Sequence, residues 1–171
     1  MAINNGKNIP MTRRTIETLY TALRQLDGVV MESCYAADAS FEDPAFTLQG
    51  RERIGGMWRM LTEATRAKGR EVWRLEFNAV DAQGQAGSAH WEAHYRFSAT
   101  GRMVHNRIDA RFEFNAEGKI VRHVDRFNFW TWSRQALGTP GLLLGWTPML
   151  RHKVQAQAAD KLDKYLAGPR G

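Results

Sequence analysis

Three side chains that could exchange protons lie in largely apolar stretches: Asp43, His123 and Asp125. Asp43 follows Phe41 and Glu42 and precedes Pro44. A carboxyl group that loses solvent beside aromatic residues has a raised pKa and becomes a better proton acceptor near neutral pH. Asp43 is therefore a candidate general base. An Asp before a proline also commonly caps a turn, and both interpretations stay open.

His123 and Asp125 are two residues apart in a segment whose apolar residues alternate. In a strand, that spacing places both side chains on one face. The same face carries three apolar residues, which indicates that it is buried: Val121, Phe127 and Phe129. A buried His and Asp need partners, either each other or Asp43. Two neighbouring carboxyl groups push their pKa values apart, so that one acts as base and the other as acid. The alternative is a structural pair at a sheet edge or a dimer interface.

The sequence does not predict a metal centre. His90 and His94 share a strand face but would stand about 13 Å apart, too far to hold one ion. Cys34 is the single cysteine, so neither a disulfide within the chain nor a cysteine cluster is expected. We expect no metal and no cofactor.

Composition excludes some function classes. The formal net charge of +6 invites a nucleic-acid interpretation, but the basic residues are scattered and no nucleic-acid motif is present, so nucleic acid is not an expected partner. No apolar run approaches the length of a membrane span, so no membrane is expected. The first fifteen residues lack the apolar core of a signal peptide, which favours a cytoplasmic protein.

The hydrophobic period changes along the chain and predicts an α+β fold. Helical spacing predicts three helices, at 12–26, 29–36 and 50–67, and a period of two then predicts four strands within 73–79, 90–97, 108–114 and 121–129. Residues 41–48 read as a short strand or turn, and 151–166 as a terminal helix. We expect one domain over 1–171, with a core at about 12–132 and a C-terminal helical extension at about 133–171. An antiparallel sheet should carry the helices on one face.

Two segments resemble a known superfamily. Residues 35–44, YAADASFEDP, followed by Gly50-Arg51-Glu52-Arg53-Ile54, and residues 118–127, GKIVRHVDRF, resemble recurrent motifs of nuclear transport factor 2-like or SnoaL-like proteins. The resemblance covers about residues 20–132. It implies a cone-shaped roll of a curved antiparallel sheet with an apolar cavity between sheet and helices.

The resemblance also implies roles for individual residues. Asp43 corresponds to the catalytic base of ketosteroid isomerases, and Asp125 to a catalytic Asp of limonene epoxide hydrolase-like proteins, with His123 beside it. Tyr20, by its spacing to Tyr35 and Asp43, corresponds to the oxyanion-binding Tyr of ketosteroid isomerases; a buried phenol can donate to a developing enolate. Tyr20 also lies on the apolar stripe of its helix, so plain packing is the alternative. We expect three aromatic residues to contact the ligand: Phe41, Trp58 and Phe127.

The match departs from both enzyme families. Ala110 stands where ketosteroid isomerases carry a second, protonated Asp, and Glu92-Ala93-His94 stands where the epoxide hydrolases carry Arg-x-Asp. The sequence thus predicts cofactor-independent acid–base chemistry of isomerase, cyclase, dehydratase or hydrolase type. The expected substrate is a small hydrophobic, cyclic or polyketide-like molecule. The alternative is a non-catalytic ligand-binding or assembly module. Because one face of the sheet is left uncovered, we also expect a homodimer.

Overall fold

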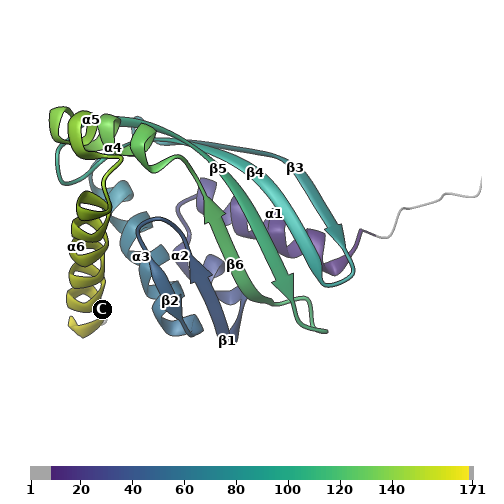
Figure 1. Cartoon of the computed structure of the whole chain (residues 1–171). Coiled ribbons are helices and arrows are strands. Elements are labelled where there is room, and N and C mark those ends of the chain that lie inside the picture. Colours follow the sequence, from purple (N-terminus) through teal and green to yellow (C-terminus); the bar gives the residue numbers. More distant parts are fainter. Residues whose placement is uncertain (1–8, 170–171) are drawn as a thin grey trace, which may run out of the picture.

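The structure is a computed structural model that describes residues 9–169 (Figure 1). Residues 1–8, on which the absence of a signal peptide partly rests, lie outside the described residues. The first half of the chain forms α1 (Met11–Arg24), α2 (Gly28–Ser33), β1 (Tyr35–Glu42), β2 (Thr47–Gln49) and α3 (Arg51–Ala67). The second half forms β3 (Arg74–Gln83), β4 (Ala86–Arg96), β5 (Met103–Phe114), β6 (Ile120–Arg126), α4 (Phe129–Leu137), α5 (Thr139–Leu144) and α6 (Pro148–Ala167).

The strands form one six-stranded sheet in the order β2-β1-β6-β5-β4-β3. The α+β class is confirmed, and the four long strands pair antiparallel as predicted. The prediction of a wholly antiparallel sheet is wrong, because β1 and β6 run parallel. These two strands are separated in sequence by α3 and four other strands, which gives the chain the long crossover that a parallel pair requires.

Three helices cover one face of this sheet, with α1 against β3 and β4 and α3 against β1 and β2 (Figure 1). The predicted helical stripe of α1 is buried there, as is the predicted apolar face of β5: Ile16, Leu19, Tyr20 and Leu23 on α1, and Ile108, Ala110, Phe112 and Phe114 on β5. The alternation in sequence therefore identified the core side of the sheet. The cone shape stays a prediction.

Tyr35 lies in a strand and not in the predicted helix 29–36. The helix α2 ends at Ser33, and Tyr35 is the first residue of β1. Asp27 caps α2 by accepting a hydrogen bond from the Val30 backbone N–H. The cap explains where the helix begins. After the six residues of α2 the chain enters the sheet as β1, which brings the fully buried Tyr35 beside β6.

Two residues predicted on the buried face of β6 lie elsewhere. A bulge between Ile120 and Arg122 puts Ile120 on the core side, so Val121 is only half-buried. Phe129 has left the sheet and begins α4, because Asn128 accepts a hydrogen bond from the Thr131 N–H and caps that helix.

The C-terminal helices add to the core beyond the predicted limit at about residue 132. Leu162 of α6 is fully buried in the main core cluster. A Cβ placed on Gly56 of α3 would lie 2.5 Å from Leu166 Cδ2, so the absence of a side chain there lets α6 approach α3 closely. Within residues 9–169, no helix is long and apolar enough to cross a membrane.

Candidate functional site

A row of hydrogen-bonded polar side chains lies buried between the sheet and the helices. Trp58 Nε1 of α3 donates to the Tyr35 hydroxyl at 3.0 Å, and that hydroxyl lies 2.8 Å from His123 Nδ1. On the other side of the ring, His123 Nε2 lies 2.9 Å from Asp125 Oδ1. His123 is fully buried, whereas the Asp125 side chain keeps 2% exposure. The structure thus brings His123 and Asp125 together on one face, as their spacing predicts.

One arrangement of protons satisfies every member of this row. Because the indole N–H of Trp58 can only donate, the Tyr35 oxygen accepts it and the Tyr35 proton is free to point at His123 Nδ1. The ring of His123 then carries its proton on Nε2 and donates it to Asp125. The row therefore has one direction, from Trp58 towards the Asp125 carboxylate.

Asp125 is the point where this row meets two other aromatic side chains. Trp91 Nε1 of β4 donates to Asp125 Oδ1 at 3.4 Å. Tyr20 of α1 packs 5.6 Å from the Trp91 ring, and burial and the nearby Asp125 charge raise its pKa well above the ordinary value. The Tyr20 hydroxyl is the one fully buried side-chain polar atom within residues 9–169 that has no hydrogen-bond partner. A buried phenol without a hydrogen-bond partner thus packs against Trp91, which itself donates to Asp125.

Asp43 lies just after β1, in the turn that the alternative interpretation proposed. Its Oδ1 accepts the backbone N–H groups of Ala45 and Phe46 at 2.7 and 2.6 Å. Burial raises the pKa of Asp43 to about 7, and the charges of Asp125 and Glu42 add to that effect, while the two backbone hydrogen bonds oppose it. The side chain is half-buried rather than pointing fully into solvent. Asp43 therefore caps its turn and also has the pKa of a base that works near neutral pH.

A further tyrosine, Tyr95 of β4, lies close enough to Asp43 for its pKa to be affected. Burial is the main cause that raises the Tyr95 pKa to about 12; a hydrogen bond from Trp132 lowers it, and the Asp43 charge raises it. Trp132 Nε1 of α4 donates to the Tyr95 hydroxyl at 2.8 Å.

The predicted ligand contacts fall in two places. Phe41 packs edge-on against Trp58 and His123, with ring centroids 5.6 and 5.0 Å away, so both aromatic residues line the buried row. Phe127 lies after β6, half-buried, 6.4 Å from the Trp132 ring. Two hollows on the surface, of about 140 and 400 Å³, are lined by neither Asp43 nor Asp125. The apolar cavity implied by the resemblance stays a prediction.

Three residues of the site had no role predicted from the sequence: Tyr35, Trp91 and Tyr95. Tyr35 stands at the start of the motif that carried the resemblance, so its position contained a usable signal. The contacts of Trp91 and Tyr95 depend on how β4 is placed against β5, β6 and α4. Strand alternation alone does not reveal that placement.

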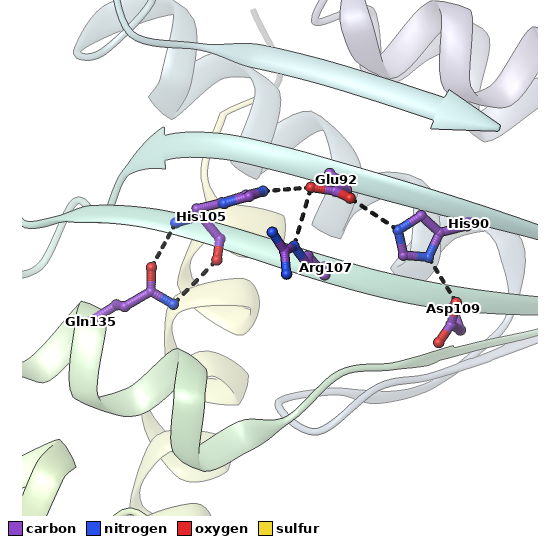
Figure 2. Close-up of polar contacts among 6 residues, drawn as sticks. All are labelled: His90, Glu92, His105, Arg107, Asp109 and Gln135. Atoms are coloured by element: carbon purple, nitrogen blue, oxygen red, sulfur yellow. Dashed lines mark hydrogen bonds and ion pairs between the residues drawn. The ribbon is translucent and has the colours of Figure 1, made fainter.

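The opposite face of the sheet carries a second polar cluster, shown in Figure 2. Glu92 accepts from His105 at 2.6 Å and lies 3.2 Å from His90, and Arg107 also donates to it. These hydrogen bonds, that of His105 first, lower the pKa of Glu92 to about 2. His90 also lies 2.8 Å from Asp109.

The homodimer was expected on an apolar open face, but the aromatic side chains of β4 point to the helices and this outer face is polar.

Among residues 9–169, no group of three or more His, Cys, Asp or Glu side chains is arranged to hold a metal ion. His94 and His105 do lie close, with stacked rings 3.9 Å apart. His105 Nε2 is bonded to Glu92 instead.

Solved structures with a similar fold come from several kinds of protein. One is a hypothetical protein with a ketosteroid isomerase-like fold from Catenulispora acidiphila, in complex with trimethylamine (TM-score 0.60, 18% identity, covering 78% of this chain and 97% of that chain). Another is an LEH-like epoxide hydrolase from M. tuberculosis (TM-score 0.58, 18% identity, 82% and 95%). A third is a candidate polyketide cyclase from Xanthomonas campestris (TM-score 0.57, 16% identity, 74% and 96%). At these identities the likeness shows the fold alone.

The sequence itself gives the family. No curated protein sequence matches the chain significantly. Residues 16–123, which span α1 to the His123 position of β6, match the SnoaL-like domain. This match covers more than half of the chain and contains Tyr20, Tyr35, Asp43 and His123. The predicted resemblance is therefore confirmed, and the chain belongs to the SnoaL-like domain family.

Proposed function

We propose that the protein catalyses cofactor-independent proton transfer on a small hydrophobic carbonyl or hydroxyl compound at the site formed by Asp43, Asp125 and Tyr20. The observation that carries the proposal is the buried Tyr20 hydroxyl, which has no hydrogen-bond partner and whose ring packs against Trp91, a donor to Asp125. An unpaired buried donor costs about 1–3 kcal/mol of stability. Such a donor is explained if a substrate oxygen is its partner.

Each group has a separate part in this reaction. Asp43, with a pKa of about 7, removes a proton from carbon or oxygen and returns it elsewhere. Tyr20 stays protonated, because its pKa is raised, and donates to the oxygen on which negative charge develops. Asp125 holds no substrate proton in this scheme: its charge raises the pKa of both other groups, and the row through His123 and Tyr35 fixes its position.

The same-fold proteins support this class of chemistry without naming the reaction. The fold is shared by proteins described as an LEH-like epoxide hydrolase and a candidate polyketide cyclase. Isomerase, cyclase, dehydratase and hydrolase reactions share a proton transfer beside a polarised oxygen. A test should therefore detect the proton transfer itself and not one product.

Deuterium exchange provides that test. The protein is incubated in D2O with a series of cyclic ketones, and NMR follows the loss of the proton signal next to the carbonyl. We expect the wild type to accelerate exchange for at least one ketone, and Asp43→Asn and Tyr20→Phe to abolish the acceleration. Asp38→Asn is the matched control, because Asp38 lies on β1, the strand that leads to Asp43, but is exposed.

The test also separates the alternative, a non-catalytic binding module. That alternative is favoured by the hydrogen bonds that tie Asp43 Oδ1 to its own turn. A ketone that raises the melting temperature of the protein without any acceleration of exchange would show binding only. In that event the enzymatic proposal is wrong.

A further inference from the structure

Six large apolar side chains are exposed at the corner of the molecule where α4, α5 and the start of α6 meet (Figure 1). We call this group the apolar tip: Trp130, Leu142, Leu143, Leu144, Trp146 and Met149. Trp146 is 75% exposed, Met149 67% and Leu143 62%. Soluble proteins seldom expose large apolar residues in such a group unless the group binds something.

Hydrogen bonds hold the tip together and remove its polar atoms from the surface. Trp130 Nε1 donates to the Leu142 carbonyl at 3.2 Å, and Trp146 Nε1 donates to the Leu143 carbonyl at 3.1 Å. Both indole N–H groups are thus paired within the tip. What the tip presents to the outside is apolar ring and side-chain surface.

A basic rim surrounds the tip. The Arg134 guanidinium lies 4.8 Å over the Trp130 ring, and that of Arg151 lies 5.1 Å over Phe129, beside the tip. His152 and Lys153 follow and are exposed. The whole segment 126–159 contains no Asp or Glu, although the chain has 18 of them. The charged side chains of the segment that carries the exposed apolar residues are therefore all positive: Arg126, Arg134, Arg151 and Lys153.

We propose that the apolar tip inserts into the surface of a bilayer that contains anionic lipids, with the basic rim on the headgroups. Apolar side chains beside Arg and Lys, together with Trp at the boundary, are the pattern of segments that lie in a membrane interface without spanning it. The anionic headgroups supply the negative charge that this segment lacks. This attachment differs from the membrane span that the sequence excludes.

A second copy of the chain fits the tip less well. In a two-fold dimer the same patch meets itself, so the Arg and Lys of one rim would face those of the other. An anionic lipid surface places opposite charges there instead. Charge complementarity therefore favours the membrane over self-association through this surface.

Co-sedimentation with vesicles tests the proposal on the full chain. We expect the wild type to sediment with vesicles of phosphatidylcholine and phosphatidylglycerol in equal parts, and not with vesicles of phosphatidylcholine alone. Leu143→Ser with Trp146→Ser should weaken partitioning at least about tenfold, because two apolar side chains no longer insert. Arg134→Gln with Arg151→Gln should weaken it by about an order of magnitude and reduce its dependence on salt.

Matched controls come from the distant helices α1 and α2. Val29→Ser removes a side chain as exposed as Met149, and Arg14→Gln removes an exposed cation. Both should bind vesicles like the wild type, and all variants should keep the wild-type circular dichroism. The proposal is overturned if the wild type does not bind the anionic vesicles, or if the tip variants bind as well as it does. It is also overturned if Leu143→Ser with Trp146→Ser changes the mass in light scattering instead, since the tip is then a self-association surface.

Discussion

Asp43→Asn should stabilise the protein at neutral and alkaline pH, although Asp43 is proposed to do the chemistry. Asn has nearly the same shape, and its Oδ1 can still accept the backbone N–H groups of Ala45 and Phe46. What the substitution removes is the negative charge that burial, Asp125 and Glu42 all oppose. Function and stability therefore make opposite demands on this position.

The magnitude follows from proton linkage. A carboxyl group whose pKa is about 7 in the folded state, against 3.8 ordinarily, binds its proton more tightly when folded. The wild type therefore loses stability as the pH rises from about 4 to about 7. The full difference corresponds to ~4 kcal/mol. Because the Asp43 side chain is only half-buried, solvent screens part of this, and we expect about 2 kcal/mol.

Urea unfolding of wild type and variant across this pH range measures the effect. The difference in unfolding free energy should be close to zero near about pH 4 and should reach about 2 kcal/mol in favour of Asn above about pH 7. Taking the difference removes the titration of groups that the two proteins share. A difference that is independent of pH, or one that grows towards acid, would refute the assigned pKa and with it the case for Asp43 as a base.

Four other outcomes are expected. Tyr20→Phe should leave the unfolding free energy unchanged or raise it by up to about 1 kcal/mol, because it removes a buried hydroxyl without a partner. Tyr35→Phe should lower it by about 1–3 kcal/mol in the same urea experiment, because an indole and an imidazole nitrogen lose their partner. Gly28→Ala should lower the unfolding free energy by about 1–3 kcal/mol, since its Cβ would lie 2.7 Å from the α3 backbone. Gly56→Ala meets only the movable end of a leucine side chain and should lower the unfolding free energy less, as measured by parallel urea curves.

The sequence predicted the long strands and the pairing of His123 with Asp125 because strand alternation is a local property. Two residues of β6 that are two positions apart must share a face wherever the strand lies in the sheet. The bulge at Ile120 escaped prediction, since it depends on how β6 is placed against β5. Val121 was therefore assigned to the wrong side.

The position of Tyr35 could not be predicted in the same way. The strand β1 is short of β-branched residues, its exposure does not alternate between Ala36 and Asp38, and its register shifts between Tyr35 and Ser40. Nothing local distinguishes this stretch from the end of a helix. Its partner is a parallel strand about half the chain away, and that contact arises only from the three-dimensional arrangement of the whole sheet.

The parallel pairing of β1 with β6 has a consequence for how the site is assembled. The hairpins β3–β4 and β4–β5 join segments that are neighbours in sequence, but Phe41 meets His123 only after a loop of many residues has closed. The row from Tyr35 to Asp125 therefore cannot exist in a chain whose local hairpins have formed while this last seam is open. Any partly folded form that lacks the seam lacks the complete site, so activity should disappear as soon as the seam opens, even while the hairpins remain.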